Sequence, residues 1–375
     1  MLPLMSDDEA AHSGRVSQAI RARIEAAGGW LPFDEFMELA LYAPGLGYYT
    51  AGGVKIGRGG DFTTAPELSD LFSACVARQC SEVLADGGSI LELGAGTGRM
   101  AFAVMTTLAS LDCLPERYFI LEVSADLRAR QQERLATLPN ELRERVVWLD
   151  ALPERPMHGV ILANEVLDAL PCQRVIVREG RAIQLGVAIE GDRFVEREAA
   201  ASDVAGWPAI EAALRFPLPD GYRTEVCPRI HPWIGSLSDS LERGLILLFD
   251  YGLPRAHYYH PQRFNGTLRC HFKQRAHDDP FINVGVQDIT AWVDFTRVAE
   301  AADESGLEVL GFATQAAFLL GLGIESMVTG LRLASEARQL LMPGEMGEAF
   351  KAMALTRNLD APLSGFSVQD LRHSL

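Results

Sequence analysis

Three glycines at every second position follow an apolar run and an acid in the segment ILELGAGTGRMA. Gly94, Gly96 and Gly98 leave the backbone bare, so a ligand can approach it without meeting a Cβ atom. A buried strand precedes them and a helix follows, which predicts a nucleotide-type ligand at the carboxyl end of a parallel sheet. The spacing differs from the G-x-G-x-x-G pattern of dinucleotide-binding folds, because Arg99 stands where the third small residue would be.

The pattern E-x-G-x-G-x-G, which begins at Glu92, resembles the first motif of S-adenosylmethionine-dependent methyltransferases. Glu122 ends the next predicted strand, where a carboxylate can accept hydrogen bonds from both ribose hydroxyls. Asp150 ends the third predicted strand, where such folds hold the edge of the adenine ring. These residues predict S-adenosylmethionine as the cofactor. The alternatives are a glycine turn that serves packing alone and acids that lie on the surface.

Three polar side chains, Asn164, Glu165 and Asp168, come directly after the predicted fourth strand. In a doubly wound sheet that point lies over the cofactor crevice. If the methyl acceptor is a guanidinium nitrogen, carboxylates can bind the planar guanidinium group through paired hydrogen bonds and increase the electron density on the reacting nitrogen. The alternative is that Asn164 caps a helix and the acids are solvated residues of its first turn. The motif is neither N-P-P-Y nor D-P-P-Y, which argues against enzymes that methylate amino groups of DNA bases.

The elements that position these residues alternate between strand and helix from Ser89 onward. Short apolar runs that alternate with helical patterns indicate an α/β fold, with a doubly wound, mostly parallel sheet covered on both faces. The expected strands are SILELG, RYFILEVS, RVVWLD, HGVILANEV and GLILLFDYG. Two helices, within RVSQAIRARIEAAGG and LPFDEFMELALYAP, are expected before the sheet.

A long glycine-rich loop, GLGYYTAGGVKIGRGGDFTTAPELS, separates those helices from the sheet. Thr64 and Glu67 fit a capping box, with Thr64 as the N-cap and Glu67 reaching back. Long loops in compact domains are often functional, so we expect this one to close over the cofactor. Asp61, Thr64 and Glu67 would then face the pocket or fix its wall. The alternative is a helix cap without a role in ligand binding.

The chain divides into four expected segments. Residues 1–85 form an N-terminal helical segment and the loop that covers the pocket, and residues 86–172 form the cofactor-binding half of the domain. Residues 173–229 alternate like antiparallel hairpins and are read as an inserted subdomain. Residues 230–375 complete the domain, with a substrate-side insertion and C-terminal helices.

Composition narrows the class of protein further. The net charge of −16 and a pI of about 5.0 argue against binding to nucleic acid. The six cysteines contain no C-x-x-C pair, so neither a zinc nor a redox site is indicated. No apolar run reaches the roughly 18 residues of a membrane span, and the first residues are acidic; we therefore expect a cytoplasmic protein. Hydrolase and kinase motifs are absent from the sequence.

The whole chain resembles the MidA-like family of methyltransferases. The family markers appear as GDFTTAPELS (Gly60–Ser69), NEVLDALP, the D-Y-G at Asp250, GTLRCH, and DITAWVDF from Asp288. The resemblance implies a seven-stranded class I methyltransferase sheet with an N-terminal helical segment over the pocket. It also implies a protein arginine as the substrate, symmetrically dimethylated. Because eukaryotic members include a mitochondrial complex I assembly factor, a respiratory complex subunit is one expected partner.

Three other functions remain open from the sequence. The chain could be a cofactor-binding assembly factor or scaffold with little turnover, because fold does not fix function. It could methylate a small molecule. A nicotinamide oxidoreductase is disfavoured by the glycine spacing. The oligomeric state is not predicted.

Overall fold

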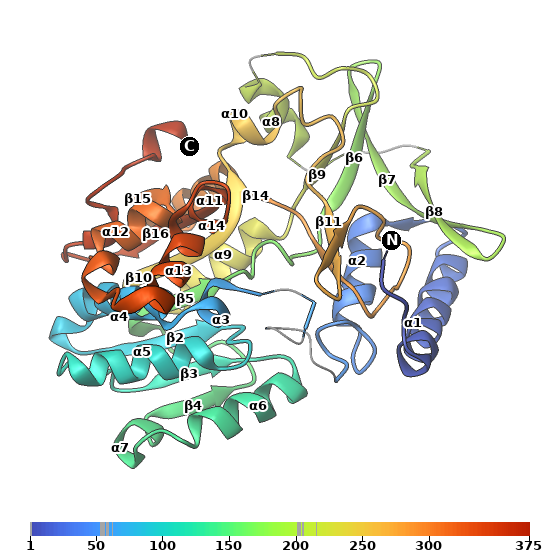
Figure 1. Ribbon diagram of the computed structural model, residues 1–375. Helices are drawn as coiled ribbons and strands as arrows, with labels where there is room; N and C mark the ends of the chain where they lie inside the picture. The colour runs from blue at the N-terminus through green and yellow to red at the C-terminus, as the bar shows by residue number, and fades with distance from the viewer. Residues whose placement is uncertain are drawn as a thin grey trace.

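The computed structural model describes residues 2–52, 57, 60–61, 63–200, 204, 206–214 and 216–375. Its largest sheet has the expected doubly wound form, with strand order β4-β3-β2-β5-β10-β16-β15 (Figure 1). Strand β16 runs antiparallel to both its neighbours, whereas the other pairs along this path are parallel. In chain order the strands are β2 (Ser89–Leu93), β3 (Tyr118–Leu121), β4 (Val146–Leu149), β5 (Met157–Asn164), β10 (Leu241–Leu253), β15 (Glu308–Thr314) and β16 (Phe350–Arg357), and β14 (Val293–Asp294) pairs with the end of β10.

Helices cover both faces of this sheet, which is why its central strands read as continuous apolar runs. On one face Phe249 of β10 packs its ring against Phe72 and Phe318, at centroid distances of 5.0 and 5.1 Å. That face carries α4 (Asp70–Val83), α5 (Arg99–Ser110), α12 (Gln315–Gly321) and α13 (Gly330–Leu341), and the other carries α9 (Ile230–Asp239) and α11 (Phe295–Glu304). The ends of the central strands are therefore held in place by a closely packed core.

The antiparallel hairpins predicted within residues 173–229 are present (Figure 1). Strands β6 (Gln173–Arg178), β7 (Arg181–Glu190), β8 (Arg193–Glu198) and β9 (Arg223–Val226) form a second sheet, which β1 (Leu31–Pro32) joins beside β7. The two predicted N-terminal helices, α1 (Asp7–Ala26) and α2 (Phe33–Tyr42), share a hydrophobic core with this sheet. The division into four segments stays a prediction.

A third, small sheet comes from the second insertion, in the order β12-β11-β13. Its strands are β11 (Arg269–Phe272), β12 (Arg275–His277) and β13 (Asp288–Thr290). The remaining elements are α3 (Ala65–Leu68), α6 (Ala125–Leu135), α7 (Asn140–Arg143), α8 (Trp207–Ala213), α10 (Arg255–Tyr258), α14 (Met346–Ala349) and the 3-10 turns Leu84–Asp86, Ile324–Met327, Ser364–Phe366 and Arg372–Ser374.

The predicted capping box at Thr64 is wrong. Thr64 is the N-cap of α3, but its side chain makes no capping hydrogen bond. The carboxylate of Glu67 does not reach back, because it accepts a hydrogen bond from the hydroxyl of Thr97 in the glycine loop. The helix also breaks at Ser69, whose extended backbone and side-chain oxygen cap α4 instead. Glu67 thus makes a long-range hydrogen bond to Thr97 in place of the predicted local bond to the start of the helix.

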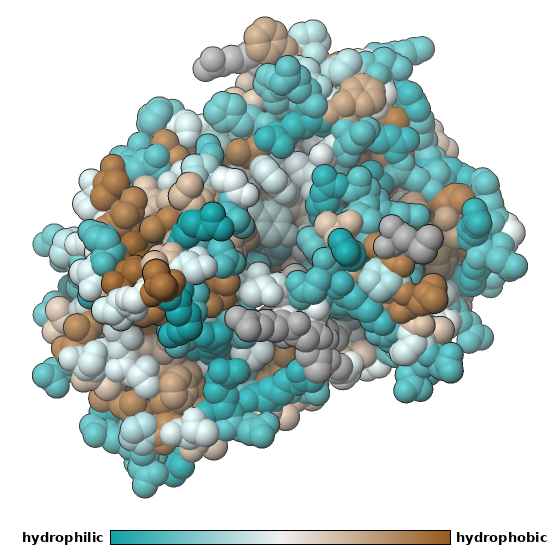
Figure 2. Space-filling model, viewed as in Figure 1, coloured by the Kyte–Doolittle hydropathy of each residue, from teal (hydrophilic) through white to brown (hydrophobic). Residues whose placement is uncertain are grey.

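The molecular surface is mainly hydrophilic on the face shown in Figure 2, in keeping with the acidic composition. A hollow lies between the part built on the large sheet and the part built on α1, α2 and the second sheet. Within the described ranges, none of the helices combines the length and the apolar character needed to cross a membrane.

Candidate active site

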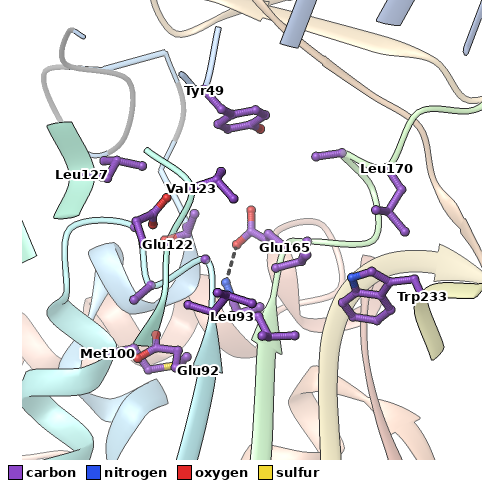
Figure 3. A pocket seen from close by; sticks show the side chains of 18 of the residues that line it. Tyr49, Glu92, Leu93, Met100, Glu122, Val123, Leu127, Glu165, Leu170 and Trp233 are labelled. Atoms are coloured by element: carbon purple, nitrogen blue, oxygen red, sulfur yellow. Dashed lines mark hydrogen bonds between the residues drawn. The ribbon is translucent and has the colours of Figure 1, made fainter. Parts of the chain in front are cut away.

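A cavity of about 500 Å³ opens at the carboxyl ends of β2, β3 and β5 (Figure 3). Ligands of doubly wound sheets bind at this edge, where the strand order reverses. Of the residues predicted from the sequence, those that line the cavity are Thr64, Glu67, Glu92, Gly94, Gly96, Glu122, Asn164 and Glu165. Gly98, Asp150, Asp61 and Asp168 do not line it.

The glycine loop turns sharply between β2 and α5. Gly94 and Gly96 have φ angles of +62° and +53°, a region that residues with a Cβ atom rarely adopt. Gly98 is the N-cap of α5, and a Cβ atom there would lie 3.2 Å from the Cα atom of Gln131. Gly98 therefore allows α5 and α6 to approach closely, whereas Gly94 and Gly96 expose backbone to the cavity.

Glu122 presents its carboxylate to the cavity from the end of β3 (Figure 3). The backbone N–H of Ser124 and the side-chain amide of Gln131 each donate to it at 2.9 Å. The same amide donates to the carbonyl of Gly96 at 2.9 Å, and Trp148 donates to the Gln131 amide oxygen at 3.0 Å. Gln131 thus ties the acid to the glycine loop, a role that no local sequence pattern predicts.

Glu92 lies beneath the glycine loop, at the base of the cavity (Figure 3). It is buried, and the hydroxyl of Tyr118 donates to it at 2.7 Å. Burial raises the pKa of Glu92 to about 7. This carboxyl can therefore gain or lose a proton near neutrality when a charged ligand enters.

Asp150 and Asp61 make contacts elsewhere. The Asp150 carboxylate forms an ion pair with Arg128 at 2.5 Å and its side chain is 87% exposed, so its role at the adenine ring stays a prediction. Asp61 accepts hydrogen bonds from the hydroxyl of Tyr48 at 2.8 Å and the backbone N–H of Lys273 at 2.6 Å. Asp61 therefore joins the pre-sheet loop to the third sheet.

The loop before the sheet contributes Thr64, Pro66 and Glu67 to the cavity wall. Arg99 of α5 donates to the backbone carbonyl of Glu67, which fixes α3 against the glycine loop. Phe62 and residues 53–56 and 58–59, which belong to the same predicted loop, lie outside the described residues. Closure of the loop over the cofactor stays a prediction.

Glu165 lies at the centre of the cavity edge, between Glu122 on one side and Leu170 and Trp233 on the other (Figure 3). It follows β5 with a φ angle of +52°, and its carboxylate accepts a hydrogen bond from the amide of Asn164 at 3.2 Å. A left-handed conformation at a residue other than glycine is uncommon and concentrates at functional sites. Burial, followed by the charge of Asp168, raises the pKa of Glu165 to about 8.

Asp168 does not line this cavity but lines a second one, of about 260 Å³. The Asp168 side chain is only 5% exposed, and its Oδ1 atom has no hydrogen-bond partner among the described residues. The backbone N–H groups of Leu167 and Asp168 donate to Asp250 at 2.9 and 3.1 Å. The alternative that these acids are solvated residues of a first helical turn is wrong, because the segment after Asn164 is a partly buried turn rather than a helix.

The stability of the fold should depend on pH through these acids. Burial raises the pKa of Glu165 and Asp288 to about 8, that of Asp168 to about 6, and that of Asp250 well above its usual range. The folded protein therefore holds protons that the unfolded chain, with carboxyl pKa values near about 4, releases. The resulting stabilisation is complete below about pH 4 and is lost as the pH rises to about 8.

Asp288→Asn replaces one of these ionisable groups with a neutral amide, and its stabilising effect should grow as the pH rises from about 4 to about 8. We expect its Tm to exceed that of the wild type by at least about 2 °C at about pH 8.5, and to match it at about pH 4. Thermal unfolding at the two pH values measures this, with the exposed Asp303 changed to Asn as the control. An equal difference in Tm at both pH values would show that Asp288 is not buried in its protonated form.

Curated relatives match most of the chain. A protein of Drosophila melanogaster, described as a mitochondrial protein arginine methyltransferase NDUFAF7 homolog, is 28% identical over 96% of this chain and 90% of its own length. Its human counterpart is 27% identical over 87% of this chain and 80% of its own length. The cytoplasmic location expected above is contradicted, because these relatives are mitochondrial proteins. The acidic residues near the start of the sequence are a property of that segment alone, and they are poor evidence for the cellular compartment of the protein.

A family model described as "Putative S-adenosyl-L-methionine-dependent methyltransferase" matches residues 75–313. A crystal structure of a Burkholderia thailandensis protein bound to S-adenosyl-homocysteine is 39% identical, with a TM-score of 0.95 over 100% of both chains. A second structure from the same organism is 38% identical, with a TM-score of 0.91 over 100% of both chains. These matches agree in function with the site, which has a glycine turn and acids at the strand ends. The chain therefore belongs to the MidA-like family of S-adenosylmethionine-dependent methyltransferases.

Proposed function

We propose that this methyltransferase transfers the methyl group of S-adenosylmethionine to the guanidinium of an arginine residue in a protein. The observation that carries the proposal is the position of Glu165. Its carboxylate lies in the wall that the cofactor cavity shares with the second, acid-lined cavity. A half-buried carboxylate at that junction suits a cationic acceptor nitrogen, since a bound cation supplies the countercharge that the carboxylate lacks among the described residues.

The cofactor end of the site follows from the same contacts. We assign Gly94 and Gly96 to the methionine part of S-adenosylmethionine, because their backbone is bare and faces the cavity. Glu122 is assigned to the ribose hydroxyls, since Ser124 and Gln131 fix its carboxylate toward the same space. Glu92 lies at the base of the cavity and is tied to β3 by its hydrogen bond from Tyr118.

The chemistry needs positioning and charge control more than a strong base. When bound, S-adenosylmethionine supplies an electrophilic methyl group on a sulfonium and leaves as a neutral sulfide. The guanidinium nitrogen forms the new bond to carbon and loses one proton, so the product remains a monocation. Glu165 can hold the nitrogen in line and receive that proton, directly or through water, because its pKa of about 8 lies close to neutrality.

The names of the curated relatives support a protein as the substrate, since they are described as protein arginine methyltransferases. The resemblance to a family that includes a mitochondrial complex I assembly factor makes a respiratory complex subunit the first protein to assay. Symmetric dimethylation is the product expected from the same resemblance.

The proposal is tested by identifying the amino acid that receives a labelled methyl group. The purified protein is incubated with S-adenosylmethionine that carries a labelled methyl group and with an extract from cells that lack the gene. We expect label in protein, and methylarginine after hydrolysis. Label in another amino acid or in a small molecule would overturn the arginine assignment, and binding of cofactor without transfer would favour a scaffold.

A further inference from the structure

The second cavity, here called the acceptor chamber, touches the cofactor cavity at Tyr49 and Glu165, which line both. Its volume is about 260 Å³. The other walls come from the ends of β5, β10 and β16 and from the third sheet, through Asp168, Tyr251, Phe350 and Asp288. The chamber is therefore assembled from segments far apart in the sequence, on the side of Glu165 opposite the cofactor.

The chamber is rich in carboxyl groups that lack a cationic partner. Glu165, Asp168 and Asp288 line it, and in the part of the chain that the structure describes no lysine or arginine forms an ion pair with them. Arg269, which also lines the chamber, pairs with Asp278 instead. The Asp168 carboxylate accepts a hydrogen bond from the Tyr251 hydroxyl, but its Oδ1 atom is buried without a hydrogen-bond partner among the described residues. Leaving such an atom unsatisfied is costly, which points to a ligand that donates hydrogen bonds.

Aromatic rings form the remaining walls of the chamber. The ring of Tyr251 makes edge contacts with Trp292 and Phe350, at centroid distances of 6.3 and 5.4 Å. The hydroxyl of Tyr49 donates to Oδ1 of Asp288 at 2.9 Å, which fixes that carboxylate at the chamber wall. Aromatic faces attract cations and stack on planar guanidinium groups in particular. The walls thus combine flat rings with carboxylates.

We infer that the acceptor chamber is the subsite for the acceptor side chain, and that Asp288 is a specificity-determining residue that selects a guanidinium over a neutral side chain of the same shape. This inference rests on the proposed function. Carboxylates on separate walls match the several N–H donors of a guanidinium, whereas an ammonium offers a smaller, more strongly hydrated point charge. A neutral urea group of equal size would leave the carboxylates without a countercharge.

Binding of a cation should also change the protonation of the chamber. Burial, followed by the charge of Asp168, raises the pKa of Asp288 to about 8 without a ligand. A guanidinium beside it favours the ionised carboxylate. Several titratable groups interact electrostatically with Asp288 or, in the case of His271, pair with it across the third sheet. They are Tyr42, Tyr48, Tyr49 and Asp61 before the large sheet, Glu165 and Asp168 after β5, and Cys270 and His271 of β11, where burial lowers the pKa of His271.

The experiment measures binding to the protein saturated with S-adenosyl-homocysteine. Three acetylated peptides with glycine on either side of arginine, citrulline or lysine are titrated calorimetrically into the wild type, Asp288→Asn, Asp168→Asn and the surface control Asp303→Asn. We expect the wild type and the control to prefer arginine over citrulline by at least about tenfold, comparable to one buried charge pair. Asp288→Asn should lose this preference while its affinity for S-adenosyl-homocysteine stays unchanged.

The outcomes separate the two claims. If Asp288→Asn and Asp168→Asn keep the arginine preference of the wild type, the acceptor chamber is not the subsite, and the proposed function stands. If the wild type itself does not prefer arginine over citrulline, both the inference and the proposed function are overturned. Equal binding of lysine and arginine by the wild type would contradict selection of a guanidinium.

Discussion

Glu165→Gln is expected to lower the rate of methylation by about 100-fold or more, comparable to the loss of one preorganised electrostatic group. The amide keeps the size of the side chain and its hydrogen bond to Asn164, but it removes the negative charge. Since positive charge passes to the acceptor nitrogen as the sulfonium becomes a sulfide, the loss should fall on kcat rather than on cofactor affinity. Single-turnover transfer of labelled methyl groups measures the effect.

The control for this variant is the affinity for S-adenosyl-homocysteine, which we expect to change by only a few fold. Asp168→Asn should also slow transfer, because its carboxylate borders the same acceptor space. Asp303→Asn, on the exposed face of α11, removes an acid remote from the site and should react at the wild-type rate. Wild-type rates for both Glu165→Gln and Asp168→Asn would remove the physical support for a cationic acceptor.

Gly96→Val is expected to abolish cofactor binding at concentrations of S-adenosyl-homocysteine that saturate the wild type. Gly96 lines the cofactor cavity with a φ angle of +53°, which a β-branched residue adopts only under strain. The valine side chain would also occupy the space where the methionine part of the cofactor is assigned. Equilibrium binding of S-adenosyl-homocysteine measures the loss.

Gly180→Val provides a matched control for backbone strain. Gly180 lies in the turn between β6 and β7, has a φ angle of +74°, and has open space where a Cβ atom would be. We expect this variant to lose some stability while it binds S-adenosyl-homocysteine like the wild type. Unchanged affinity in Gly96→Val would exclude the glycine loop as the cofactor site.

The central sheet and half of the site are predictable from the sequence because their signals are local. Strand β2, the glycines after it and the acid Glu92 form one continuous pattern, and Glu122 ends the next strand in the same register. Asn164 and Glu165 likewise follow a strand directly. The right-handed crossover of parallel strands then brings these ends to one edge of the sheet.

The rest of the site is not predictable because its contacts join distant segments. Glu67 fits a capping box by spacing, yet its carboxylate binds Thr97, thirty positions along the chain. Tyr49 and Asp288 meet across the N-terminal segment and the third sheet, and the spacing of residues around them does not indicate this contact. Asp288 and Tyr251 do belong to the family markers DITAWVDF and D-Y-G, which are the one signal in the sequence for the acceptor chamber.

Mass spectrometry of proteins from cells with the gene, without it, and with Glu165→Gln in its place tests the central claim most directly. We predict at least one protein whose arginine is methylated in the first cells and unmethylated in the other two. Identical arginine methylation in all three, or a loss of methylation confined to other residues or to small molecules, would contradict the assignment of this site to protein arginine methylation.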